Sequence, residues 1–368
     1  MKKLVLVGGG HAQLSVLRSL ATARLQSVEA TLITPSEHQN YSGMLPGWMA
    51  GHYTQEQCRI DLRPLVRAAK VKLVLDRVTS LDTHQRCVTL ADGQRVNYDV
   101  LSLDIGSETA SLSLAALGEK LLPIKPLDAF FAAWPTVLAR VRAQPGLRLV
   151  VVGAGAAGVE VALAARFAFS RAKLNVKVAL VVGSAGLLPG HAAAVQQRVR
   201  RLAERFGVVL HQAHAQALAT PRGLTLSDGQ ELVADCVIAA TGARAAPWLA
   251  GTGLTLDDAG YVLVDAHHRS LSHPNVFAAG DTCARQDVAM ARSGVHAVFA
   301  GPVLAHNLLA TLSGQPLHTY QPKPRPLYLL ACGPRYAVAS WGDWSAQGAW
   351  VWYWKNWIDR RFMRRFSA

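Results

Sequence analysis

The chain has 368 residues, of which 51% are hydrophobic and 17% are charged. This composition excludes an intrinsically disordered protein, and the length exceeds what one ordinary hydrophobic core fills, so we expect two domains. The formal net charge of +14 is compatible with ordinary surface charge, with an anionic lipid surface or with a nucleic acid, and of these partners we do not expect the nucleic acid.

The first predicted elements are a β-strand, a glycine loop and a helix. The strand is Leu4-Val5-Leu6-Val7, the loop is Gly8-Gly9-Gly10, and the helix covers residues 14–25. The two lysines before the strand make this start resemble a signal peptide, but its apolar run is too short for one. No uninterrupted apolar run reaches the roughly 20 residues of a membrane-spanning helix. We therefore expect a cytoplasmic protein without a spanning segment.

A second copy of this pattern begins near residue 149. The apolar strand Leu149-Val150-Val151-Val152 leads into a glycine loop at residues 153–158, and an alanine-rich helix continues to about Phe169. In both halves a second apolar strand follows the helix, at residues 30–33 and at residues 176–182.

The later parts of the two halves also correspond. An Asp-Gly-Gln turn stands at residues 92–94 and again at residues 228–230. Gly106 and Gly242 each come 13 residues after the glycine of that turn. Two halves that share a strand, glycine loop, helix, strand, hairpin and closing glycine indicate a duplicated dinucleotide-binding domain.

The glycine loops indicate dinucleotide ligands. A pyrophosphate binds backbone N–H groups at the positive end of a helix, and glycines allow the tight turn, the close approach of phosphate and the packing of helix on strand. The second loop has all three of these glycines: Gly153, Gly155 and Gly158. The first loop has Gly8 and Gly10 but Gln13 in the third place, so its tight helix–strand contact is in question.

The acidic residue that usually binds a ribose hydroxyl about 20 residues further on is missing from both halves. The second strand of the first half ends at Thr34, and that of the second half ends at Val182 with no carboxylate nearby. Hydroxyl or backbone groups must therefore hold the adenosine ribose in the first half. In the second half the choice between NADH and NADPH stays open.

A third marker follows the second copy: His273-Pro274-Asn275-Val276-Phe277-Ala278-Ala279-Gly280-Asp281. With the two glycine loops in this order, the chain up to about residue 310 resembles the pyridine nucleotide–disulfide oxidoreductase superfamily. The resemblance implies that Asp281 hydrogen-bonds the ribityl chain of FAD and that the next helix points its N-terminus at the flavin. It also implies an α/β fold of two Rossmann-type (three-layer ββα) domains, with the FAD domain split around the NAD(P) domain.

The resemblance and the motifs together give domain bounds and site residues. The expected FAD-binding domain comprises residues 1–115 and 254–315, the NAD(P)-binding domain residues 116–253, and a C-terminal interface or membrane-association segment residues 316–368. The expected FAD-binding residues are Gly8, Gly10, His11, Ala12, Thr34, Gly106, Gly280, Asp281 and Ala297. The expected NAD(P)-binding residues are Gly153, Gly155, Gly158, Glu160 and Gly242. We expect no metal site.

The cysteines narrow the resemblance within the superfamily. The two closest of the five, Cys58 and Cys87, are 29 residues apart, which argues against disulfide reductases and against a true sulfide:quinone oxidoreductase with paired cysteines. Within the superfamily the chain resembles type II NADH dehydrogenases, and it resembles even more the flavoprotein domain that is sometimes fused to selenide, water dikinase. Three segments carry it: residues 40–47, 294–298 and 354–362.

No residue is assigned a catalytic role with certainty, and two are expected beside the flavin. Pro46, with Tyr41 and Met44, either lines the flavin pocket or belongs to an ordinary proline-glycine loop. His296 either donates a hydrogen bond to the flavin ring or is a packing histidine. The helix that starts near residues 294–297 is expected to place its positive end near the reduced flavin.

The last 21 residues, 348–368, combine aromatic and arginine residues. Trp354, Ile358, Phe362 and Phe366 recur at four-residue spacing, as on one face of a helix. This composition is typical of a membrane interface, where aromatic rings lie at headgroup level and cations meet anionic lipid. The alternative is a closing helix that packs on the FAD domain with its arginines in solvent.

Three functions are compatible with these observations. The leading one is an FAD-dependent NAD(P)H oxidoreductase that passes electrons to a quinone-type acceptor, peripheral on the inner face of the cell membrane and able to form a homodimer. The second reduces a soluble sulfur- or selenium-containing acceptor, with Cys283 or Cys332 as a lone thiol relay. The third is a non-enzymatic flavin-binding redox sensor whose basic tail docks on a partner or a nucleic acid.

Overall fold

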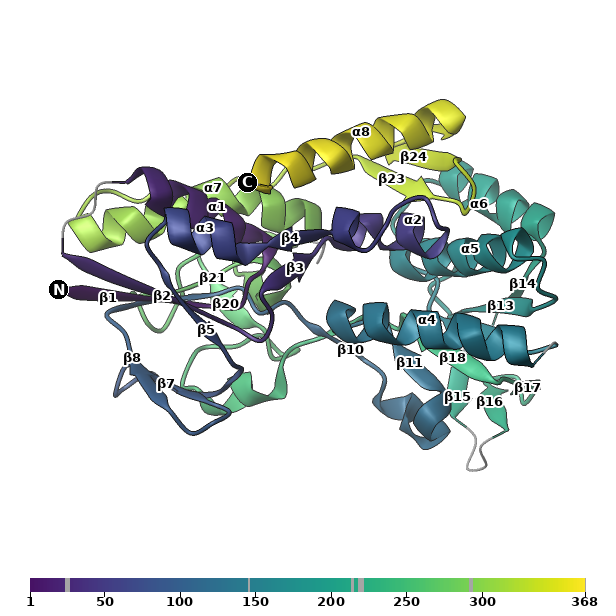
Figure 1. Ribbon diagram of the computed structural model, residues 1–368, viewed down its shortest axis with the longest axis horizontal. Coiled ribbons are helices and arrows are strands. Elements are labelled where there is room, and N and C mark those ends of the chain that lie inside the picture. The colour runs from purple at the N-terminus through teal and green to yellow at the C-terminus, as the bar shows by residue number, and fades with distance from the viewer. Residues whose placement is uncertain (24–26, 145, 213–214, 218–221, 291–293, 368) are drawn as a thin grey trace.

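The computed structural model describes residues 1–23, 27–144, 146–212, 215–217, 222–290 and 294–367. Two five-stranded sheets, in which every neighbouring pair is parallel, form the centres of its two halves (Figure 1). The first has the order β21 (Val276–Ala278), β9 (Val100–Leu103), β1 (Lys2–Val7), β2 (Val28–Thr34) and β5 (Lys72–Leu75). The second has the order β11 (Leu121–Pro123), β18 (Cys236–Ala239), β12 (Arg148–Val152), β13 (Lys177–Val182) and β14 (Val208–Gln212).

The chain returns to the first sheet after it has completed the second. Strand β21 lies beside β9, with Val276 paired to Leu101, although 172 residues separate the end of β9 from the start of β21 in the chain. This arrangement confirms the predicted α/β fold with two Rossmann-type halves, the first of which is assembled from two separated stretches.

The two halves make the same contacts at equivalent places. In the first half the Asp99 carboxylate accepts a hydrogen bond from the backbone N–H of Lys3, and in the second the Asp235 carboxylate accepts one from that of Arg148. Each half also has a three-stranded antiparallel sheet. These sheets are formed by β6 (Val78–Asp82), β7 (Cys87–Leu90) and β8 (Arg95–Asn97), and by β15 (Ala215–Ala217), β16 (Gly223–Leu226) and β17 (Glu231–Val233). Both predicted Asp-Gly-Gln turns connect the last two strands of these sheets.

Helices cover one face of each five-stranded sheet (Figure 1). Those of the first half are α1 (His11–Thr22), α3 (Leu62–Ala68) and α7 (Gly294–Ser313), and those of the second are α4 (Leu127–Ala143), α5 (Ala156–Arg171) and α6 (Ala193–Phe206). Short pairs of strands join these layers: β3 (His38–Asn40) with β4 (Arg59–Asp61), β10 (Glu108–Thr109) with β19 (Ala243–Arg244), and β20 (Val262–Val264) with β22 (Cys283–Arg285). The short helix α2 (Leu45–Met49) lies between the halves and packs on α5.

Helix α7 was not predicted as a possible membrane span, because polar residues interrupt its apolar stretch. By length and composition alone it is apolar enough to cross a membrane, but 56% of the stretch that meets this test is buried inside the fold. It packs closely on α1, because a Cβ atom at Gly301 would lie 2.7 Å from the Ser15 hydroxyl oxygen. The helix is therefore accounted for as a core element of the first half.

The structure also shows how Gln13 replaces the third glycine of the first loop. Its side chain is fully buried, and its amide nitrogen donates hydrogen bonds to the carbonyl oxygen of Ser102, at 3.2 Å, and to the Ser102 hydroxyl, at 3.1 Å. A polar contact between α1 and β9 therefore takes the place of the close helix–strand packing that a glycine would allow.

The C-terminal segment forms a small sheet and a long helix. The sheet consists of β23 (Tyr328–Ala331), β24 (Ala337–Trp341) and β25 (Trp344–Gly348), and it leads into α8 (Ala349–Phe366). Helix α8 runs across the top of both halves in Figure 1, from β24 and α6 to α1. Phe362 and Phe366 are buried, so the predicted four-residue row does not form one exposed face. Trp350, Tyr353 and Trp357 are the aromatic residues that α8 exposes.

We predict that Gly153→Ala destabilises the protein far more than Gly242→Ala. The two glycines have nearly the same positive φ, 109° and 107°, so both substitutions introduce the same backbone strain, worth about 1–3 kcal/mol. A Cβ atom at Gly153 would also lie 2.2 Å from the carbonyl oxygen of Ala240, whereas nothing lies within 4 Å at Gly242. Urea unfolding of both variants measures the difference, and equal losses of unfolding free energy would show that the close approach is unimportant.

Candidate functional site

The backbone of the first glycine loop lies very close to the end of β9. Gly8 has a φ of +90°, and a Cβ atom there would lie 2.3 Å from the carbonyl oxygen of Asp104. Gly10 stands at the N-cap of α1, where no side chain of the cap residue satisfies the helix N–H groups. Beside Gly9 lies the hydroxyl of Thr34, 3.3 Å from where a Cβ would be. The predicted residues Gly8, Gly10 and Thr34 therefore lie together at the carboxyl end of the sheet.

His11 directly follows this loop and is the first residue of α1. Its Nε2 atom is buried, and within the described ranges it has no hydrogen-bond partner. Burial lowers the pKa of His11 to about 4, so the ring is neutral at physiological pH. The ring contacts Tyr41, at 5.5 Å between centroids, and Phe362 of α8, at 5.7 Å.

Asp281 lies next to the same loop, after β21. Its Oδ2 atom accepts a hydrogen bond at 2.6 Å from the ammonium group of Lys125 and another at 3.2 Å from the Ser107 hydroxyl. The adjacent Thr282 hydroxyl accepts from the backbone N–H of Gly106 at 3.1 Å. Sequence reasoning missed Lys125 and Ser107, because neither stands in a motif and only the tertiary fold brings them to Asp281.

Helix α7 meets this region through Ala297 and His296. A Cβ atom at Gly280 would lie 3.4 Å from that of Ala297, so the helix start lies beside the third marker as expected. His296 is buried, its Nδ1 atom is 3.4 Å from the Tyr320 hydroxyl, and burial lowers its pKa. The structure thus gives this histidine a packing partner, and its contact with a flavin remains a prediction.

The second glycine loop is more open than the first. Gly155 is exposed, and nothing lies within 4 Å of a Cβ atom placed on it. At Gly158 the same atom would lie 1.7 Å from the carbonyl oxygen of Gly153, so only glycine fits there. Gly242 lies after β18, the strand next to β12. Among the described residues, no side chain therefore lies close to Gly155, the N-cap of α5.

Glu160 lies away from that opening and is partly buried, near the buried ion pair of Lys355 and Asp359 from α8. Its Oε1 atom accepts a hydrogen bond from the backbone N–H of Ala331 at 2.7 Å. Nearby, the Lys355 ammonium donates to the Asp359 carboxylate at 2.9 Å and to the carbonyl oxygen of Gly43 at 2.7 Å. Burial raises the pKa of Glu160 to about 7, although Lys355 opposes this shift. Burial lowers the pKa of Lys355, but Asp359 and Glu160 outweigh it and leave that pKa raised.

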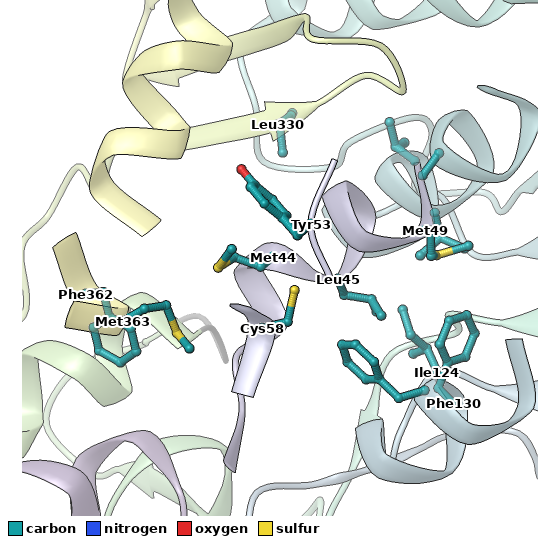
Figure 2. Packing of buried hydrophobic residues seen from close by; sticks show 14 of the residues in the cluster. Met44, Leu45, Met49, Tyr53, Cys58, Ile124, Phe130, Leu330, Phe362 and Met363 are labelled. Carbon is teal, nitrogen blue, oxygen red and sulfur yellow. The ribbon is translucent and has the colours of Figure 1, made fainter. Parts of the chain in front are cut away.

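The segment predicted to line a flavin pocket lies beside this charged group. Tyr41 stacks on Phe362 at 4.6 Å, and burial, followed by the nearby Asp359 carboxylate, raises the pKa of its hydroxyl. Pro46 lies buried in the first turn of α2. Met44 belongs to a buried hydrophobic cluster that also contains Phe130 of the second half and Leu330 and Phe362 of the C-terminal segment, all labelled in Figure 2.

The two cysteines proposed as thiol relays are both buried. Cys283 is 2% exposed and Cys332 is fully buried. Burial raises the pKa of Cys332 far above its ordinary value, and the Glu160 carboxylate adds to this shift. Because the thiolate is the reactive form, Cys332 is poorly suited to relay electrons to a soluble acceptor.

We predict that Glu160→Gln changes the dependence of stability on pH. The carboxyl has an ordinary pKa of 4.5 and a folded-state pKa of about 7, so its protonated form favours folding. Its contribution is complete below about pH 4.5 and is lost as pH rises through 7. Relative to the variant, the parent protein should lose about 2–3 kcal/mol of unfolding free energy across this range. Glu204→Gln, at an exposed position of α6, serves as the control and should leave the profile unchanged. Parallel profiles for the parent and Glu160→Gln would contradict the assignment.

Comparison with known proteins places these features in a family. Residues 2–302 match the family described as pyridine nucleotide-disulphide oxidoreductase. The chain is 30% identical over 294 residues to the ferredoxin–NAD(+) reductase component of the biphenyl dioxygenase system of Paraburkholderia xenovorans, a match that covers 76% of this chain and 67% of that protein. It is 28% identical over 246 residues to an NADH dehydrogenase-like protein of Mycobacterium tuberculosis, covering 62% of this chain and 59% of that protein.

The whole chain also superimposes on a solved structure. The sulfide:quinone oxidoreductase of Aquifex aeolicus has a TM-score of 0.81 and 16% sequence identity, and the match covers 100% of this chain and 92% of that one. These comparisons confirm the predicted family, its NADH dehydrogenase-like character and the cofactors FAD and NAD(P)H. The chain belongs to the pyridine nucleotide-disulphide oxidoreductase family and is an FAD-dependent NAD(P)H oxidoreductase.

Proposed function

We propose that this oxidoreductase passes its electrons to a quinone at a membrane surface. The observation that supports the proposal most is the arrangement of the C-terminal segment. It exposes aromatic side chains on one side, while on the other it packs against the segment that we expect to line the flavin. A protein of this construction would hold the flavin next to the lipid phase from which a quinone arrives.

The residues of the first half fit FAD. His11 stands at the N-terminus of α1, directly after the glycines, and its buried Nε2 atom has no hydrogen-bond partner among the described residues. The Asp281 carboxylate is near enough to influence the pKa of His11. We propose that Gly8, Gly10, Ala12 and Thr34 contact the adenosine and pyrophosphate portion of FAD, and that Asp281 accepts hydrogen bonds from the ribityl chain. Lys125 would hold the Asp281 carboxylate in place for this role.

The residues of the second half fit the phosphates of a pyridine nucleotide. The exposed Gly155 leaves room above the positive end of α5, which is where anions bind. FAD, when bound, would accept hydride from the nicotinamide and pass the electrons on to a separate acceptor. The chain itself supplies positioning, through the two glycine loops, and exclusion of water, through Tyr41 and Phe362. We propose Glu160 and Pro46 as neighbours of the nicotinamide and the flavin respectively.

Five large aromatic residues of the C-terminal segment support the membrane part of the proposal. They are each about half exposed: Trp341 (55%), Trp344 (47%), Trp350 (54%), Tyr353 (53%) and Trp357 (51%). Exposed arginines accompany them on α8, and the Arg361 guanidinium lies 5.3 Å from the centre of the Trp357 ring. Aromatic rings with adjacent cations are typical of proteins that bind at the interface of anionic lipid.

We predict that Gly155→Val separates the two cofactor sites. The backbone at Gly155 has an ordinary φ of −70° and open space around it, so the fold should accept valine. The branched side chain would keep a pyrophosphate from the helix N–H groups. Flavin content should therefore stay normal, while anaerobic bleaching of the flavin by NADH or NADPH slows at least tenfold.

The reciprocal variant Asp281→Ala should give mostly colourless protein, since it removes charge-assisted hydrogen bonds worth roughly 1.5–3 kcal/mol each. Loss of flavin from Gly155→Val together with full flavin in Asp281→Ala would reverse the assignment of the two halves.

We predict that the triple variant Trp350→Ser, Tyr353→Ser, Trp357→Ser loses membrane binding and keeps its fold. These side chains are exposed, whereas deletion of α8 would also remove the buried Phe362 and Lys355. Sedimentation with anionic vesicles should fall at least tenfold, and reduction of a long-chain quinone should fall with it. Reduction of a small water-soluble quinone should be unchanged.

A control variant with Leu112→Ser and Val209→Ser removes exposed apolar residues elsewhere, at positions that are 71% and 52% exposed. It should behave like the parent protein. If the parent protein stays in the supernatant with anionic vesicles at low salt, the membrane proposal is wrong.

A ferredoxin is the second candidate acceptor. The biphenyl dioxygenase relative, at 30% identity, is named as a ferredoxin–NAD(+) reductase component. The net charge of +14 would also attract an acidic protein. NAD(P)H-driven reduction of an added ferredoxin, unaffected by the triple aromatic substitution, would favour this acceptor over a quinone.

A further inference from the structure

We propose that Asp104 couples FAD binding to the uptake of a proton, because its carboxyl occupies the phosphate end of the flavin cradle and must be neutral for FAD to bind tightly. The proposal rests on the FAD role assigned above to the first glycine loop. It names a residue that the motif of that loop does not include, since Asp104 is 92 positions away from Ala12 in the chain.

The carboxyl of Asp104 lies directly against the N-terminus of α1. Its Oδ2 atom accepts hydrogen bonds from the backbone N–H groups of Ala12, at 2.9 Å, and of Gln13, at 3.2 Å. Cβ atoms placed at Gly10 and Gly280 would lie 2.3 Å and 2.7 Å from its Oδ1 atom. The residue is only 3% exposed. Asp104 therefore fills the space between the glycine loop and the segment before Asp281.

The second half of the chain shows what this position looks like without the carboxyl. A Cβ atom at Gly8 would lie 2.3 Å from the Asp104 carbonyl oxygen, and one at Gly153 would lie 2.2 Å from the Ala240 carbonyl oxygen. Ala240 is thus the structural counterpart of Asp104, because it directly follows β18 just as Asp104 directly follows β9. At the second site the described residues place the methyl-bearing Ala240 where the first site has the Asp104 carboxyl, and Gly155 is open.

An ionised carboxylate and a pyrophosphate would compete for the same positive helix end. Two N–H groups that a phosphate could use are already bound to Asp104. A carboxylate and a phosphate at the same buried helix end would also repel each other. A protonated carboxyl removes the repulsion, and its O–H group can donate to a phosphate oxygen. The affinity of the protein for FAD therefore depends on the protonation state of Asp104.

The surroundings favour the neutral form of Asp104. Burial raises its pKa to about 7, against the hydrogen bonds from Gln13 and Ala12, and the charge of Asp281 adds to the rise. The neighbouring charged groups include the ion pair of Lys125 and Asp281, and His11, whose pKa burial lowers to about 4. Because His11 is already neutral at pH 6, Asp104 is the group whose titration should govern FAD affinity between pH 6 and 9. A phosphate nearby would raise its pKa further.

The test is the pH dependence of FAD release from the full-length holoprotein. The protein is diluted in buffers from pH 6 to pH 9, and free FAD is measured after ultrafiltration. For the parent protein the Kd should be constant near pH 6 and rise about tenfold per pH unit above pH 7. For Asp104→Asn and Asp104→Ala, the second of which copies Ala240, the Kd should be flat and lower than that of the parent at pH 9. Asp99→Asn, at the opposite end of β9, should keep the parent slope.

Proton uptake gives a second measurement. Calorimetric titration with FAD in two buffers of different ionisation enthalpy should report about one proton taken up at pH 8 by the parent protein and about none by Asp104→Asn. A pH slope in both Asp104 variants equal to that of the parent would overturn the proposal and leave Asp104 as a helix cap. If instead Asp281→Ala kept full flavin and no Asp104 variant changed the Kd at any pH, the FAD assignment of the first half itself would fail.

Discussion

The close approach of a helix N-terminus to the end of a parallel strand is the constraint on which both halves depend. Gly8 and Gly153 bring their backbones so near the carbonyl oxygens of Asp104 and Ala240 that no side chain fits between them. This contact directs the first N–H groups of each helix over the edge of its sheet. Every other part of the proposed chemistry depends on that placement, because the two cofactors must present their reactive rings to each other from two such edges.

The C-terminal segment connects these edges. Lys355 and Asp359 form a buried ion pair whose desolvation is offset because the Lys355 ammonium also binds the Gly43 carbonyl oxygen and lies near Glu160. The pair therefore joins α8 both to the expected flavin segment and to the helix of the second glycine loop. A merely peripheral tail would not need buried charges, so the aromatic surface of α8 and the interior of the enzyme are parts of one structure.

The sequence predicts the repeated elements well, because strand, glycine loop and helix follow from local periodicity and from the backbone freedom of glycine. It predicts the return of the chain through β21 only through resemblance to a family. Contacts between distant residues escape both routes. Lys125 beside Asp281, and the Ser102 partner of Gln13, depend on tertiary placement. The tail shows the same limit, since spacing alone put Phe362 in a row with Trp354 and left open what that row contacts, whereas the structure stacks Phe362 on Tyr41.

The placement of β21 and α8 also has a consequence for the order in which the protein can assemble on the ribosome. Among the described strands, those of the second sheet lie between Leu121 and Ala239, so this sheet can be complete before β21 and α8 are made. The first half begins earlier but lacks its edge strand until residue 278 has emerged, and lacks Phe362 until still later. The first half is therefore the later of the two to close, and the flavin site that we propose there is complete only after Phe362 has been made.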